Sequence, residues 1–288
     1  MMGGVIPESD LACERRRADV SVGGVELKKE RHGSFSWERL RITSEEGERC
    51  IGRPIGHYDT LTTPRMDRLD SCDIEDAAEE LSRELCMILD ANRVYPERLL
   101  VVGLGNRNLT PDAVGPRAAE LVNPTMHIVG YSKRMFDSLE CSEIAVCTPG
   151  VTAESGMEAA DTVRGICSNI HPDAVIAIDA LASRSSERLG STIQISDTGI
   201  FPGSGIGNCR AAIDRESVGV PVIAIGVPTV IDTRVFINEE MSAILEREVS
   251  LKRNAEPMFV SPREVNEITD CAAKIIATAI NQAFGAEG

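Results

Sequence analysis

Leu99-Leu-Val-Val-Gly-Leu-Gly-Asn-Arg-Asn-Leu-Thr-Pro-Asp-Ala-Val-Gly-Pro116 and Ala174-Val-Ile-Ala-Ile-Asp-Ala-Leu-Ala182 are the stretches that decide the fold. Each contains a short apolar run with an aspartate at or just after its end. Such runs are typical of strands buried on both faces of a parallel sheet. Functional groups collect at the carboxyl ends of parallel strands, so Asp112 and Asp179 are expected to meet in one cleft.

Strand and helix patterns alternate through the rest of the chain and predict an α/β fold. Further strands are expected at 143–147, 191–195 and 220–226, and helices at about 112–122 and 157–170. Another helical pattern begins at Ile74, behind Asp73 as its N-cap, and a last helix begins with Ser261 as its cap and runs to about Phe284. Alternating residues from Val20 to about Pro64 predict an N-terminal β-ribbon. No repeat or linker divides the chain.

Composition and charge exclude several classes of protein. The 288 residues carry a net charge of −15 and only 3% aromatic residues, which argues against a protein that binds nucleic acid. The longest apolar run, 220–231, is too short for a membrane span, and the N-terminus has no apolar signal core, so a cytoplasmic protein is expected. Nine scattered cysteines without a CxxC motif indicate reduced thiols, and four isolated histidines argue against a zinc site.

Two short motifs allow more than one reading. The glycines of Gly103-Leu-Gly105 approach a dinucleotide-binding loop, but the third glycine is missing and a tight turn after the strand is the favoured interpretation. A nucleotide-binding regulator without catalytic activity therefore remains an alternative. Asp197-Thr-Gly199 has the triplet of pepsin-like proteases, but in one copy, and it also fits a turn. The glycine-rich stretch after it, with Gly203 and Gly205, could line the cleft and offer N–H groups to substrate.

Asp112 and Asp179 also fit a catalytic role. Two carboxylates that share a site cannot both ionise easily, so one keeps a proton and donates it while the other accepts one. With a water molecule between them, such a pair can hydrolyse an amide. The alternative is structural, with Asp112 as a helix N-cap and Asp179 as a cap at a strand end. The spacing alone leaves both open.

Six motifs in sequence order resemble the germination protease (spore endopeptidase) family. They are Val101–Asn106, Leu109–Pro116, Ala174–Ser185, Thr192–Ile200, Pro202–Asn208 and Gly219–Val230, and the resemblance runs from about 99 to 232. It implies a three-layer α/β/α sandwich with a largely parallel central sheet, similar to the hydrogenase-maturation proteases. It also implies an endopeptidase that degrades small acid-soluble spore proteins in the spore core and forms a homotetramer. Segments 123–142 and 233–260 depart from the family pattern or do not align with it.

The resemblance further implies an inactive precursor and particular site residues. The family cuts after an acidic residue and before an apolar residue and Ala, which matches Ser9-Asp10-Leu11-Ala12. We therefore expect a pro-segment of residues 1–10, removed between Asp10 and Leu11, and a single peptidase domain of residues 11–288. The family's two catalytic aspartates correspond to Asp112 and Asp179, without a cofactor, although the same carboxylates could instead hold a divalent metal ion. Arg107, Arg184, Arg188 and Asp197 are candidates for binding substrate.

Overall fold

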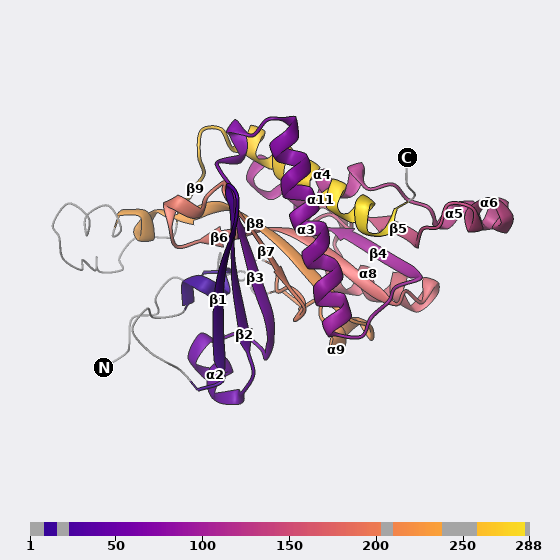
Figure 1. Cartoon of the computed structure of the whole chain (residues 1–288), viewed down its shortest axis with the longest axis horizontal. Coiled ribbons are helices and arrows are strands. Elements are labelled where there is room, and N and C mark those ends of the chain that lie inside the picture. The colour runs from indigo at the N-terminus through magenta and orange to yellow at the C-terminus, as the bar shows by residue number, and fades with distance from the viewer. Residues whose placement is uncertain (1–8, 16–22, 203–209, 238–257, 286–288) are drawn as a thin grey trace.

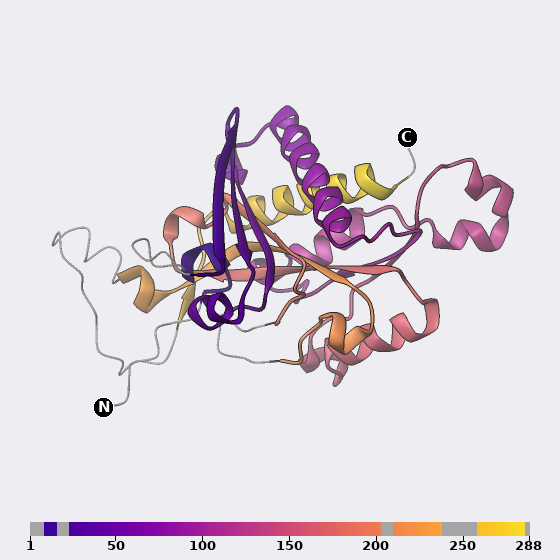
Figure 2. The same ribbon diagram turned by 60° about the horizontal axis from the view of Figure 1, so that its bottom comes forward.

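The molecule is built around one large sheet that carries helices on both faces. The computed structural model describes residues 9–15, 23–202, 210–237 and 258–285. Helices α3, α4 and α11 lie on one face of the sheet, and α8 and α9 lie on the other (Figures 1 and 2). The three-layer α/β/α class is therefore confirmed.

The strands follow the expected alternation and add an antiparallel half. They are β1 (Val25–His32), β2 (Phe35–Ile42), β3 (Gly56–Thr62), β4 (Arg98–Gly103), β5 (Glu143–Cys147), β6 (Ala174–Ser183), β7 (Thr192–Ser196), β8 (Val222–Asp232) and β9 (Phe259–Val260). Their order in the sheet is β1-β2-β3-β7-β8-β6-β4-β5, with β9 beside β8. Parallel pairing is confined to β5, β4, β6 and β8, because the N-terminal ribbon joins the sheet edge to edge through β7.

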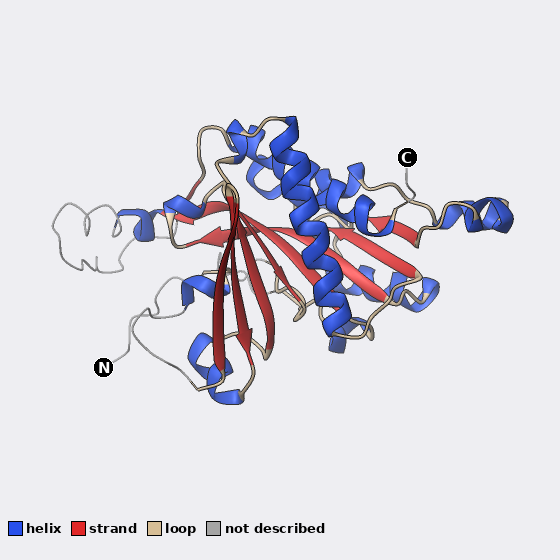
Figure 3. Ribbon diagram, in the orientation of Figure 1, coloured by secondary structure: helices blue, strands red, loops and turns tan. Residues whose placement is uncertain are grey.

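Most helices connect one strand to the next along the chain, and Figure 3 shows helices in blue on either side of the red sheet. They are α1 (Ala12–Arg15), α2 (Glu45–Ile51), α3 (Ser71–Ala91), α4 (Val114–Leu121), α5 (Met126–Tyr131), α6 (Lys133–Asp137), α7 (Thr152–Ser155), α8 (Ala159–Ile170), α9 (Arg215–Val218) and α11 (Val265–Phe284). Short 3-10 turns occur at Met66–Arg68, Thr110–Asp112 and Ser186–Arg188. Helices α5 and α6, in the segment that departs from the family pattern, project from the sheet beside β5 (Figure 1). None of the helices in the described part of the chain is long and apolar enough to span a membrane.

Two helix starts differ from the sequence expectation. The N-cap of α3 is Asp70 rather than Asp73, which instead lies in the first turn and accepts the N–H of Asp70 to complete a capping box. The last helix begins at Val265 with Glu264 at its cap position, because the chain leaves β9 at Ser261 and turns before the helix can start. The expected end at Phe284 is confirmed.

Separate apolar clusters fill the two sides of the sheet. The larger cluster joins alternate residues of β4, β6 and β8 to α3, α4 and α11, with Val101, Ile176 and Ile225 completely buried. The cluster on the other face contains Leu100 and Val175, together with Leu11 from the N-terminal segment. Successive residues of β4 and β6 thus enter opposite cores, which is why these strands read as continuous apolar runs.

A buried carboxyl pair lies between the ribbon and α3. Asp59 of β3 is 4% exposed and is hydrogen-bonded to Glu84 of α3, which also pairs with Arg39 of β2. Burial, followed by the charge of Glu84, raises the pKa of Asp59 to about 8. Asp59 therefore keeps its proton in the folded protein over a range where the unfolded chain has lost it.

Asp59→Asn should make the free energy of unfolding less dependent on pH. In the original chain, the raised pKa means that the contribution of Asp59 to stability is complete below about pH 4 and is lost as the pH rises to about 8. The asparagine keeps a donor for Glu84 and removes this loss, so the variant should be more stable at pH 8 by on the order of 2 kcal/mol. Urea unfolding at pH 5 and pH 8 measures the difference. The control is Asp76→Asn, at an exposed position of α3, the helix that carries Glu84. Equal pH dependence of the unfolding free energy in all three proteins would contradict the prediction.

Candidate active site

A cavity of about 340 Å³ opens at the carboxyl ends of the parallel strands β4, β6 and β8. Its walls include Asp112, Asp179, Asp10 and Arg210. The two aspartates predicted from the sequence to meet therefore line one cavity, at the position that the topology of parallel sheets favours. Leu104, Leu109, Val151, Leu181 and Phe259 give the same cavity an apolar lining.

Asp112 is held by a loop that closes tightly around it. Its Oδ2 accepts the N–H of Asn106 at 2.8 Å, and Thr229 Oγ1 fixes the preceding turn by donating to the carbonyl of Pro111 at 2.6 Å. Gly105 has φ of 110°, and a Cβ there would lie 2.1 Å from the carbonyl oxygen of Asp112. The glycine pattern after β4 thus serves the close approach of this loop to Asp112.

Asp179 lies within β6 rather than at its end. The strand continues to Ser183, and the Asp179 side chain is 5% exposed and accepts the N–H of Ala180 at 2.9 Å. Burial, and then the charge of Asp112, raise its pKa well above the ordinary value. Asp179 therefore favours the protonated form.

Asp112 has the better setting for a negative charge. Burial also raises its pKa, but the N–H of Asn106 and the positive charge of Arg210 act in the opposite direction. Neither structural alternative holds, because the N-cap position of α4 is Ala113 and Asp179 is not at a strand end. The geometry is that of two carboxyl groups in one water-accessible cavity, with Asp179 the more strongly driven to keep a proton.

The N-terminal segment is docked against the same site. Asp10 donates its N–H to the carbonyl of Ala182 at 3.0 Å, and its Oδ2 accepts the N–H of Ala182 at 2.9 Å. The charge of Asp10 is a further cause of the raised pKa of Asp179, so the two carboxyl groups are near neighbours. The predicted cleavage site thus lies along the end of β6, in the manner of an added strand residue.

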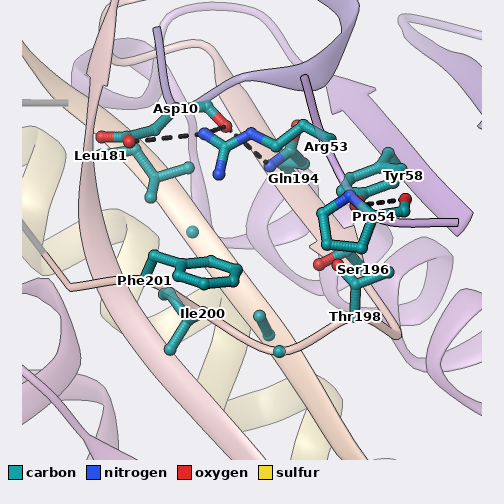
Figure 4. Close-up of a pocket in the computed structure, with 13 residues that line it drawn as sticks. Asp10, Arg53, Pro54, Tyr58, Leu181, Gln194, Ser196, Thr198, Ile200 and Phe201 are labelled. Atoms are coloured by element: carbon teal, nitrogen blue, oxygen red, sulfur yellow. Dashed lines mark hydrogen bonds and ion pairs between the residues drawn. The ribbon is translucent and has the colours of Figure 1, made fainter. Parts of the chain in front are cut away.

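An arginine from outside the predicted set contacts Asp10 (Figure 4). Arg53 Nη2 lies 3.5 Å from Asp10 Oδ1 and donates to the Asp10 carbonyl oxygen at 3.0 Å. Gln194 of β7 donates to the same carbonyl oxygen at 3.4 Å. Arg53 therefore places a positive charge beside the acidic residue.

The residues after Asp10 are also bound in place. Leu11 is completely buried within the apolar cluster of α8 and α9, and its N–H donates to Ser9 Oγ at 3.0 Å. Ala12 is completely buried too and donates its N–H to Gln194 Oε1 at 2.8 Å. Both side chains after Asp10 are thus enclosed by apolar residues, Leu11 in the cluster of α8 and α9 and Ala12 in a separate cluster with Leu40 and Tyr58.

Comparisons with known proteins agree with this geometry and identify one family. A family model described as germination protease matches residues 6–256. The germination protease of Caldanaerobacter subterraneus subsp. tengcongensis is 41% identical, over 87% of this chain and 77% of its own. That of Clostridium tetani is 35% identical, over 96% of this chain and 94% of its own.

The chain belongs to the germination protease family. Membership makes it a peptidase of spore germination and confirms the resemblance drawn from the sequence motifs. A solved structure of a [NiFe] hydrogenase maturation protease, HycI from Thermococcus kodakarensis, aligns with 65% of this chain and 94% of its own, with a TM-score of 0.35 and 18% identity.

The three arginines predicted from the sequence to bind substrate have other partners in the structure. Arg107 is exposed and pairs with Glu120. Arg188 pairs with Glu38 and lies 3.6 Å from Glu14, and the backbone N–H of Arg184 donates to Glu14 at 2.7 Å. Arg184 and Arg188 therefore meet the N-terminal segment four residues beyond the acidic position for which they were proposed.

Asp197 lies outside the cavity that contains Asp112 and Asp179. Its carboxylate accepts hydrogen bonds from the backbone and ring of His57 and from the side chain of Asn92. These bonds tie the turn after β7 to β3 and to the end of α3, which is a structural use of the carboxylate. Gly203 and Gly205 lie outside the described residues.

Sequence reasoning missed Arg53 and Gln194 for different reasons. Arg53 follows the left-handed Gly52 that ends α2, far from every motif, and nothing in its surroundings distinguishes it from a surface arginine. Gln194 could have been found, because it is a buried amide within the otherwise short-chain and apolar strand Thr192-Ile-Gln-Ile-Ser196. A buried amide must find partners, and here it finds the N-terminal segment.

Within the described residues, no group of three or more His, Cys, Asp and Glu side chains is arranged to hold a metal ion. The acidic groups at the cavity are Asp112, Asp179 and Asp10, and Asp10 is engaged by Arg53 and by the N–H of Ala182. Asp112 and Asp179 thus form the carboxyl pair of this cavity, with Asp10 beside them.

Proposed function

We propose that the chain is an endopeptidase that begins the degradation of small acid-soluble spore proteins during germination. It cuts after Glu or Asp and before an apolar residue and Ala, with Asp112 and Asp179 as an acid and base pair that needs no metal ion. It is made as an inactive precursor that removes its own residues 1–10. The family supports the peptidase activity, and the docked segment supports the specificity and the self-processing.

One observation carries this proposal. Asp10 lines the cavity of Asp112 and Asp179 and is paired to β6 and to Arg53, and the next residue, Leu11, is buried. A segment held in this way is both a substrate and an obstacle, because another protein chain cannot pair with the end of β6 while Asp10 does. Removal of the segment therefore frees the site for other substrates.

The protonation states suggest that Asp112 acts as the base and Asp179 as the acid. Ionised Asp112 takes a proton from water as the water oxygen bonds to the carbonyl carbon of Asp10. Protonated Asp179 then gives its proton to the nitrogen of Leu11, and the carbon–nitrogen bond breaks. The products are a carboxyl group on Asp10 and an amine on Leu11, and transfer of a proton from Asp112 to Asp179 restores the pair.

The remaining elements of the proposal follow the family. The active enzyme is a homotetramer in the cytoplasm of the spore core, where its substrates are found. The projecting α5 and α6 present exposed Tyr131 and Met135, which could contact a second subunit. Neither nucleic acid nor a membrane is a partner.

The full chain, incubated alone, should acquire a new N-terminus at Leu11. Mass spectrometry of the product checks this, and incubation of the processed enzyme with a small acid-soluble spore protein should yield fragments cut after Glu or Asp. EDTA should leave both rates unchanged.

Each other result contradicts a separate part of the proposal. A different N-terminus would contradict the processing site, and loss of cleavage in EDTA with recovery on adding a divalent cation would favour the metal-dependent alternative. No cleavage of either substrate, together with thermal stabilisation by a nucleotide, would favour the regulator suggested by Gly103-Leu-Gly105.

A further inference from the structure

The carbonyl oxygen of Asp10 receives two side-chain hydrogen bonds. Arg53 Nη2 donates at 3.0 Å and Gln194 Nε2 donates at 3.4 Å (Figure 4). This carbonyl belongs to the predicted scissile peptide bond, and its oxygen becomes negatively charged when water attacks the carbon. Donors already aimed at such an oxygen favour the transition state over the ground state.

Gln194 is held with its NH₂ group facing this oxygen. Its Oε1 accepts the N–H of Ala12 at 2.8 Å, so its nitrogen is turned toward Asp10 on the other side of Leu11. The one amide thus spans the scissile bond and fixes the segment on both sides of it. The strand β7 that carries Gln194 is fully buried, which keeps this arrangement rigid.

Arg53 is likewise held in place and desolvated. Its side chain is 12% exposed, and within the described residues its Nε is one of two buried side-chain polar atoms that have no hydrogen-bond partner. A cavity of about 30 Å³ beside Asp10, Arg53 and Gln194 leaves the guanidinium room to follow the oxygen as the carbon becomes tetrahedral. A buried charge with an unused donor suits a group whose partner gains charge during the reaction.

We propose that Arg53, assisted by Gln194, is a further catalytic residue that stabilises the negative charge on the carbonyl oxygen before the cut. This rests on the function proposed above. As water adds to the carbon and gives its proton to Asp112, the electron pair of the carbonyl double bond moves to the oxygen that Arg53 and Gln194 hold. The pair returns when the bond to Leu11 nitrogen breaks and Asp179 protonates that nitrogen.

Arg53 also lies 3.5 Å from the Asp10 carboxylate, so its effect on the side chain must be separated from its effect on the carbonyl. A double-mutant cycle does this. In the original chain, Arg53→Ala should slow self-cleavage by about 10²- to 10³-fold. In an Asp10→Asn chain, which keeps the carbonyl and lacks the carboxylate, Arg53→Ala should still slow it more than about tenfold. If Arg53 served only the acidic side chain, the second loss would disappear, and the proposal would be wrong.

Two further variants test the chemistry when Arg53→Ala folds poorly. Arg53→Lys keeps the charge with fewer fixed donors and should lose about tenfold. Gln194→Glu still accepts from Ala12 but places a carboxylate against the carbonyl oxygen, and should lose about 10²-fold. Millimolar guanidinium ion should restore part of the rate of Arg53→Ala and none of the rate of Gln194→Glu.

The matched control is Arg117→Ala, a partly buried arginine on α4 that pairs with Asp270 of α11. It should self-cleave at the original rate. Failure of the original chain to cleave would contradict the proposed function itself. Original-rate cleavage by Arg53→Ala and Gln194→Glu, in a chain that does cleave, would overturn this inference alone.

Discussion

Asp179→Asn and Asp112→Asn should each reduce cleavage of every substrate by at least about 10³-fold. An asparagine at 179 cannot deliver the proton that the leaving nitrogen needs, and an asparagine at 112 cannot take one from water. The same fall should be seen for self-cleavage of the full chain and for a spore protein, measured by mass spectrometry. Neither exchange adds volume, and Asp179→Asn removes a buried ionisable group, so both variants should fold.

The pH profile separates the two roles. The raised pKa of Asp112 means that cleavage falls on the acid side as this base becomes protonated, and the higher pKa of Asp179 means that it falls on the alkaline side as this acid ionises. A bell-shaped profile is therefore expected.

The control for the two cavity variants is Asp161→Asn, at an exposed position of α8. Cleavage at the original rate by Asp112→Asn or Asp179→Asn would show that the exchanged carboxyl group is structural.

Asp10→Lys should reduce self-cleavage by about a thousandfold while leaving the active site intact. The lysine would bring a second positive charge against the buried Arg53 and would lose the bond to the N–H of Ala182. An unpaired charge at such a position costs about 2–5 kcal/mol, which keeps the segment from docking. First-order loss of full-length chain, followed by mass spectrometry, measures the effect.

The same variant distinguishes an obstructed site from a damaged one. Because the undocked segment no longer covers the end of β6, full-length Asp10→Lys should cut an added spore protein faster than full-length Asp112→Asn/Asp10→Lys, which should not cut it at all. Asp161→Lys controls for the change in net charge and should process normally. If Asp10→Lys self-cleaved at the original rate, the pairing of Asp10 with Arg53 would have no part in recognition.

The parallel core could be predicted from sequence because its physical basis is local. A strand buried on both faces must be apolar at every position, so the runs at 99–103 and 174–178 stand out. The placement of Asp112 and Asp179 in one cavity then follows, because both come after Gly103 and Ile178, the last residues that pair β4 with β6. The antiparallel pairing of β3 with β7 could not be predicted, since the sequence of neither strand specifies which strand lies beside it.

The partner of Asp10 could not be predicted for a similar reason. Charge attraction requires a cation that is near the acidic residue in space. The sequence shows only which arginines lie close to the motifs along the chain, and these are Arg107, Arg184 and Arg188. The sheet instead brings the ribbon, and with it the loop after α2, beside β7 and the N-terminal segment. Arg53 reaches Asp10 because β2 pairs with β3 and β3 pairs with β7, and neither pairing can be read from the sequence.

If the chain cleaves itself as proposed, the burial of Leu11 would give that reaction a direction. Its neutral amide, bonded to Ser9 inside the protein, would become an ammonium group when the preceding bond is cut, and Asp10 would gain a second carboxylate beside that of its own side chain. New ions held away from water raise the free energy of the cut arrangement by several kcal/mol. The two ends would thus be driven apart, so the proposed self-cleavage would release the severed peptide and would not be reversed.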